Sequence, residues 1–176
     1  MTNRAIVGAA LLCAAFAAAC GSKEPADTAR QQGPQGPETR WLRGLSATDV
    51  RNAVAARALA CEGPAKEGAS SVWTCGAATP LVSYKVRFYG SAPLKIEYLI
   101  ATVTQSGSAK IDLVQPLFVN LAGLHFEGSD APRAREWVLK ALEAGGGDTS
   151  FGPARFRVSG DISRMTLEIK ASGSDW

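Results

Sequence analysis

The chain has 176 residues, of which 46% are hydrophobic and 20% are charged, a composition typical of an ordinary globular protein. From residue 41 onward, 15 Lys and Arg residues stand against 13 Asp and Glu residues, so the net charge of that part is about +2. These charges form no runs, and such a distribution lacks the basic footprint of a nucleic-acid-binding protein. We therefore expect one folded domain that has no nucleic acid as its partner.

The first twenty residues have the organisation of an export signal. Arg4 precedes an apolar run over residues 5–19, which is too short for a comfortable membrane span. Three alanines at 17–19, Cys20 and a Gly-Ser pair follow one another at its end. This ending resembles the lipobox of bacterial lipoproteins, after which the leader is cut and the cysteine receives lipid. A plain signal peptide and an uncleaved anchor are the two alternatives.

The resemblance implies that residues 1–19 are removed and that Cys20 carries a diacylglyceryl thioether and an N-terminal acyl chain. Three acyl chains would hold the protein on a membrane permanently, because two lipid signals already anchor a protein stably. We therefore expect it on the cell membrane or outer membrane, facing the periplasm or the cell exterior. Residues 20–40 are rich in Gly, Pro and Gln and predict a disordered tether, followed by a single domain over 41–176.

Cys61 and Cys75 are the only thiols left in the domain once Cys13 leaves with the leader and Cys20 is acylated. An exported chain meets an oxidising compartment, which favours a disulfide between them. A zinc site would need further ligands than a single histidine, and thioredoxin-like redox chemistry would need a C-x-x-C spacing. We predict a structural disulfide, and the alternative is a pair of unbridged buried thiols.

The first half of the domain predicts a helix followed by three strands. Ser46 and Asp49 have the spacing of a capping box, and apolar residues then recur at helical spacing as far as Cys61. A short strand over 72–75, a strictly alternating strand over 82–89 and an apolar strand over 94–105 should follow as an antiparallel meander. The disulfide should tie the first of these strands to the preceding helix.

The second half predicts two helices followed by two strands. An apolar helical pattern over 111–124 contains Pro116, so we expect a helix that begins late or bends there. The next helix begins after Ser129 or Asp130 and stops at a run of three glycines. We expect the tail after residue 171 to fray. The order of elements predicts an α+β fold, an antiparallel sheet of about five strands with helices mainly on one face. The last two strands are predicted around 154–158 and 165–170.

His125 lies in the densest group of reactive side chains in the sequence, with Glu127, Ser129 and Asp130 close by. A hydrolase or a metal-dependent enzyme centred on His125 is therefore one hypothesis. Against it, the serine and the aspartate fit a helix cap, a G-x-S-x-G elbow is lacking, and one histidine cannot make a two-histidine metal site. We predict that the protein is not an enzyme, with no catalytic residue, no metal and no cofactor.

Lys85, Arg87 and Tyr89 share the wetter face of the strand predicted over 82–89 and form a basic and aromatic strip. Such a strip fits an acidic partner or a peptidoglycan-like polymer, and the alternative is an ordinary solvated sheet surface. We therefore expect a lipid-anchored, non-enzymatic binding, assembly or structural module of the cell envelope, with an envelope protein or a cell-wall polymer as partner. The apolar strand over 94–105 suggests a third hypothesis, a carrier of a small hydrophobic ligand.

Overall fold

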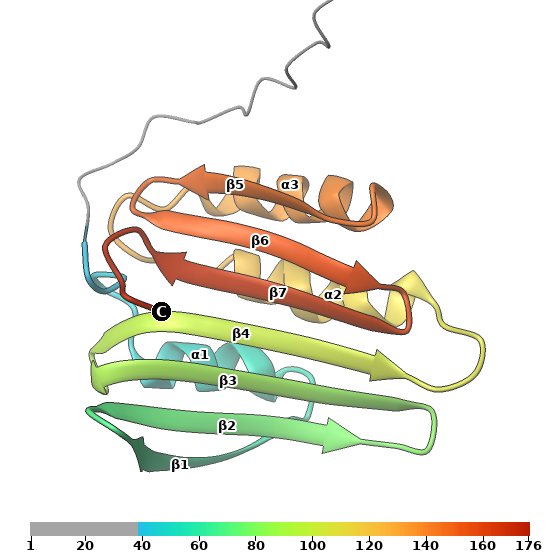
Figure 1. Ribbon diagram of the computed structural model, residues 1–176, viewed down its shortest axis with the longest axis horizontal. Helices are drawn as coiled ribbons and strands as arrows, with labels where there is room; N and C mark the ends of the chain where they lie inside the picture. Colours follow the sequence, from blue (N-terminus) through green and yellow to red (C-terminus); the bar gives the residue numbers. More distant parts are fainter. Residues whose placement is uncertain (1–38) are drawn as a thin grey trace, which may run out of the picture.

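The computed structural model describes residues 39–176, so the predicted leader, Cys20 and nearly all of the predicted tether lie outside the described residues. Seven strands form one antiparallel sheet in the order β1-β2-β3-β4-β7-β6-β5. The described helices α1, α2 and α3 all lie behind one face of this sheet (Figure 1). The predicted α+β class is confirmed, whereas the predicted number of about five strands is wrong.

The elements follow one another as one helix, four strands, two helices and three strands. The meander β2-β3-β4 and the hairpin β6-β7 are the two units that the sequence predicts, and the pairing of β4 with β7 joins them into one sheet. The bounds are α1 Ala47–Ala55, β1 Ala60–Glu67, β2 Ser70–Ala78, β3 Val82–Ala92, β4 Lys95–Gln105, α2 Ile111–Ala122, α3 Ala131–Glu143, β5 Gly147–Phe151, β6 Ala154–Asp161 and β7 Arg164–Ala171.

Helix α1 begins at the predicted capping box. The Asp49 backbone N–H donates to the Ser46 hydroxyl at 3.2 Å, and the Ser46 backbone N–H donates to the Asp49 carboxylate at 2.9 Å. These bonds satisfy N–H groups that the start of a helix leaves without a partner. The bonds from Ser46 also hold the pKa of Asp49 below its usual value, so this carboxylate is charged near neutral pH.

The chain leaves helix α1 earlier than the spacing of its apolar residues predicts. Ala58 has a φ of +54°, outside the helical region, and Leu59 beyond it is buried in the core. Cys61 therefore lies in strand β1, opposite Cys75 of β2, and not at the end of a helix. The disulfide between the two cysteines is confirmed, but it joins two neighbouring strands and not a strand and a helix.

The two strands that the sequence does not predict, β1 and β5, lie at the edges of the sheet. β1 exposes nearly all its side chains and contains Pro64, while β5 begins inside the glycine run and has 5 residues. Each pairs with a single neighbour, β2 or β6. A proline is tolerated in β1 because an edge strand has N–H groups that need no partner in the sheet.

The core lies between the sheet and the three helices. Alternate residues of the central strands, including Phe88 and Leu167, are fully buried there against apolar residues of α2 such as Phe118. Helix α2 contains Pro116 in its interior and begins before it, so the prediction of a late start is wrong. Among the described residues, no helix is long and apolar enough to cross a membrane.

Residues 172–176 do not fray, contrary to the prediction. The Gly173 backbone N–H donates to the Thr39 carbonyl at 3.0 Å, and the Arg40 guanidinium pairs with the Asp175 carboxylate at 2.7 Å. This segment runs from the end of β7 onto the face of the sheet opposite the helices, where Figure 1 shows its end in front of β4. The closing segment therefore contributes side chains to that face.

Candidate functional site

The face of the sheet opposite the helices, called the open face below, carries mainly polar, charged and aromatic side chains in rows that cross the strands, two of which lie beside the aromatic residues. Neighbours within a row lie on adjacent strands about 5 Å apart, so side chains from distant parts of the sequence act together. The first row is Val72, Tyr89, Tyr98, Lys170, Arg155 and Ser150, and the second is Thr74, Arg87, Ile100, Glu168, Arg157 and Asp148.

An aromatic cluster of Tyr89, Tyr98 and Trp176 occupies the middle of the open face. The two tyrosine rings are 5.6 Å apart, and the Trp176 indole lies 4.5 Å from Tyr89 and 6.1 Å from Tyr98, measured between ring centroids. Tyr89 is only 6% exposed, whereas Trp176 is 43% exposed. The indole therefore covers Tyr89 and is itself the aromatic surface that a ligand meets first.

The hydroxyl groups of the two tyrosines are hydrogen-bond donors near neutral pH. Burial raises the pKa of Tyr89 and, together with the neighbouring Glu168 carboxylate, that of Tyr98. The Tyr98 hydroxyl donates to Glu168 Oε1 at 3.1 Å. The Glu168 carboxylate is thus partly occupied by a bond inside the protein.

The predicted strip of Lys85, Arg87 and Tyr89 lies on the open face, as its alternation indicates. Arg87 forms an ion pair with Glu67 of β1, and its guanidinium carbon lies 5.0 Å from the centre of the Tyr89 ring. Lys85 is exposed on the same face. We expected Tyr89 to be exposed to solvent, but it is buried because Trp176 covers it.

Basic residues of β6 and β7, which are not among the predicted site residues, flank the aromatic cluster. Arg155 of β6 lies directly opposite Lys170 of β7, and Arg157 is the next residue of β6 on the same face. Arg155 pairs with Asp148 at 2.7 Å, and Lys170 donates to the main-chain oxygen of Trp176. In the sequence of β6, arginine alternates with apolar residues, and this alternation predicts that both arginines lie on the face opposite the core.

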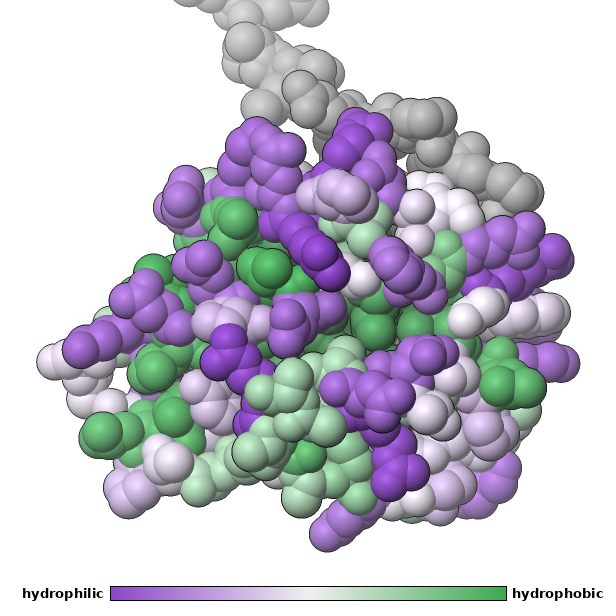
Figure 2. All heavy atoms as spheres, turned by 180° about the vertical axis from the view of Figure 1, so that it is seen from behind, coloured by the Kyte–Doolittle hydropathy of each residue, from purple (hydrophilic) through white to green (hydrophobic). Residues whose placement is uncertain are grey.

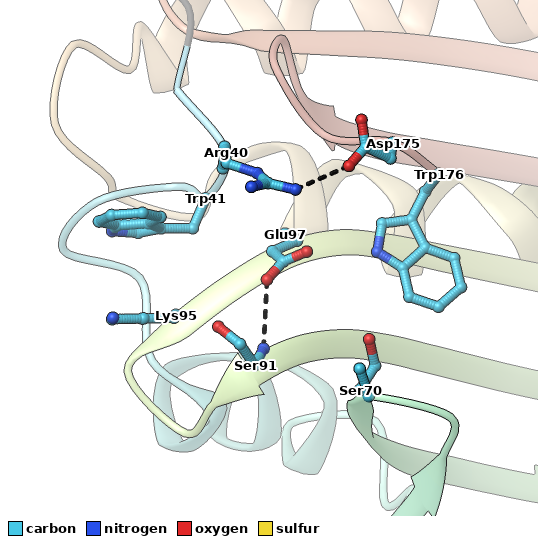
Figure 3. Close-up of a pocket in the computed structure, with 9 residues that line it drawn as sticks. Arg40, Trp41, Ser70, Ser91, Lys95, Glu97, Asp175 and Trp176 are labelled. Atoms are coloured by element: carbon cyan, nitrogen blue, oxygen red, sulfur yellow. Dashed lines mark hydrogen bonds and ion pairs between the residues drawn. The ribbon is translucent and has the colours of Figure 1, made fainter.

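Two hollows adjoin at the Trp176 indole. The larger has a volume of about 560 Å³ and is lined by Trp41, Lys95, Glu97 and Asp175 among others (Figure 3). The smaller has a volume of about 240 Å³, and Trp176 lines both. The remaining lining of the smaller hollow is Tyr98, Arg155, Arg157, Glu168 and Lys170.

The two hollows differ in charge. In the larger one, Arg40 pairs with Asp175, and Lys95 lies 5.0 Å from the Trp41 ring centre, while Glu97 lies between the two tryptophan side chains in Figure 3. Two basic residues and two acidic residues therefore balance each other in the larger hollow. The smaller hollow has three basic residues against one carboxylate, so it is the positively charged half of the site.

His125 lies on the helix side of the sheet, away from this site. It is exposed in the loop between α2 and α3 and lines a hollow of about 460 Å³ among the helices. Ser129 accepts a backbone N–H within that loop and Asp130 caps α3, so both have structural partners. Figure 2 shows that hydrophilic side chains mix with hydrophobic ones over the helix side. Within residues 39–176, no group of three or more His, Cys, Asp and Glu residues is placed to hold a metal ion.

We compared the chain with known protein families, curated proteins and solved structures. No protein-family model matches the chain, and no curated protein or solved structure matches it significantly. The chemistry of the open face is therefore the basis on which a function can be argued. Stacking, charge and hydrogen bonding are the interactions that its side chains offer.

Proposed function

We propose that this protein is a lipid-anchored, non-enzymatic binding module of the bacterial cell envelope, and that its open face holds the partner. The lipobox-like sequence before Cys20 supports the anchor, and the disulfide fits an oxidising compartment. The observation that carries the binding role is the exposed Trp176 indole, which lies over Tyr89 and Tyr98 between two hollows. Exposed aromatic residues beside basic ones are typical of recognition surfaces.

The membrane anchor is tested by the variant Cys20→Ala. In cells fed a palmitate analogue that can be tagged, the natural chain should become labelled, because its cysteine accepts the acyl groups. Cys20→Ala should lose the label and keep its leader, which electrophoresis detects as a larger chain. Cys13→Ala is the matched control, since it removes a leader thiol and should leave labelling intact. Equal labelling of Cys20→Ala and the natural chain would contradict the anchor.

The binding surface is tested by photo-crosslinking in living cells. A photoreactive amino acid at Lys85, on the open face, should give an adduct with an envelope polymer or protein, because a partner on that face lies within its reach. The same amino acid at Lys140, on the exposed side of α3, is the matched control and should give none. The Lys85 adduct should fade in Trp176→Ala. Adducts that form equally at both positions, or only at Lys140, would show that the partner binds elsewhere.

A further inference from the structure

We infer that the partner of the open face is an acidic polysaccharide, with a carboxylate-bearing sugar in the smaller hollow and a neighbouring uncharged sugar in the larger one, on either side of Trp176. This inference rests on the proposed function, because it names the ligand of the same surface. It adds a chemical role for each hollow and for the indole between them.

The smaller hollow is suited to an anion. Arg155 and Lys170 face each other directly in the pairing of β6 with β7, and like charges in that position destabilise a sheet. Arg157 adds a third cation, while Glu168, the one carboxylate of the hollow, accepts the Tyr98 hydroxyl. Asp148 already pairs with Arg155, and the main chain of Trp176 accepts a hydrogen bond from Lys170. Arg157, for which the described residues offer no ion pair, is therefore the cation left for a bound carboxylate, which can accept paired hydrogen bonds from its guanidinium group.

The indole of Trp176 favours a sugar over an acidic peptide. One face of many sugar rings consists of C–H groups, which pack on a flat aromatic surface, whereas an aspartate or glutamate side chain offers no such ring. Tyr89 and Tyr98 support the indole from below and hold its exposed face toward the ligand. The backbone groups of the central strands are already paired within the sheet, so the open face offers no edge to which a peptide could add as a strand.

The larger hollow is suited to an uncharged sugar. Its basic and acidic residues balance, and the Arg40–Asp175 pair and Glu97 present donors and acceptors side by side (Figure 3). Sugar hydroxyls both donate and accept hydrogen bonds, so they match such a mixed lining. A second indole, that of Trp41, also lines this hollow. Its volume of about 560 Å³ is in the range of small-molecule sites.

The test uses the full-length lipidated chain in phosphatidylcholine vesicles and records sugar binding by calorimetry. A hyaluronan hexasaccharide, in which uronate and uncharged sugars alternate, should bind saturably, and chitohexaose, a neutral chain of the same length, should bind about tenfold more weakly. Arg157→Gln should weaken hyaluronan binding about tenfold and leave chitohexaose binding unchanged. Trp176→Ala should weaken both. Arg164→Gln, which removes an equal charge at the other end of the hairpin, is the matched control and should change neither.

Several results would overturn the inference. Hyaluronan and chitohexaose binding equally would show that the cations have no role, and polyglutamate or phosphatidylglycerol vesicles binding as tightly as hyaluronan would show that charge alone suffices. Absence of sugar binding while the Lys85 crosslink still forms would overturn the ligand assignment and leave the proposed function standing. Absence of both would overturn the two together. Melting temperatures of the variants, which should stay close to that of the natural chain, confirm that each is folded.

Discussion

Replacing Phe88 with alanine should lower the free energy of unfolding by about 3 to 5 kcal/mol, the largest effect that we expect from one substitution in this domain. Phe88 has no exposed surface, and its ring stacks on that of Trp73 with the centroids 5.3 Å apart. The substitution removes apolar burial, breaks the aromatic pair and leaves a cavity. The cavity cannot collapse easily, because backbone pairing to β2 and β4 holds strand β3 in place.

Urea unfolding followed by circular dichroism measures this loss. Leu94→Ala is the matched control, because Leu94 is 73% exposed and its truncation should change the free energy of unfolding by less than about 0.5 kcal/mol. A loss of less than about 1 kcal/mol in Phe88→Ala would be incompatible with the tightly packed core described above.

Removing the disulfide should lower the free energy of unfolding by about 3 kcal/mol, the second largest effect. Cys61 and Cys75 are 14 residues apart, and closing a loop of that size restricts the unfolded chain. The crosslink also secures an edge strand, since β1 pairs only with β2 and exposes nearly all its side chains. We therefore expect amide exchange to become faster in β1 and to stay slow in the central strand β4.

Two forms of the protein separate the crosslink from packing. The chain reduced under native conditions loses the bond and keeps both side chains, whereas a Cys61→Ala, Cys75→Ala double variant also truncates the buried Cys75. Their urea unfolding curves, compared with that of the oxidised chain, should show most of the loss in the reduced form already. If the oxidised and reduced chains unfold at the same urea concentration, the stabilising role of the disulfide is refuted.

The elements with one buried face could be predicted from the sequence, because their patterns are local. Strand β3 alternates strictly, and the capping box of Ser46 and Asp49 marks the start of α1. The edge strands β1 and β5 could not be predicted in this way. β1 is mostly exposed and β5 is short and only partly buried, so their residues show no alternation, and the strands exist because a neighbouring strand pairs with them. The alanines that follow α1 likewise carry too little apolar surface to show where the helix ends.

The candidate site could be predicted only in part. Alternation places Lys85, Arg87 and Tyr89 on one face, and the same pattern is present in β6 for Arg155. The pairing of β4 with β7 cannot be predicted from a local pattern, and it is this pairing that brings the basic residues of β6 and β7 beside the tyrosines. Trp176 follows a short polar segment that shows no pattern. It lies over Tyr89 because folding brings the tyrosine rings of the sheet beside it.

The junction between Thr39 and Gly173 has a mechanical consequence. Thr39 and Arg40 stand where the proposed tether enters the domain, and both bond to the segment that carries Trp176. If the chain is anchored as proposed, tension from the membrane would act on this junction. The pull of an immobile ligand would act on the adjacent indole. The load would then pass between neighbouring points at one end of the molecule and spare the strand ladder. In this way the sheet would link a membrane to a stationary polymer without being stretched.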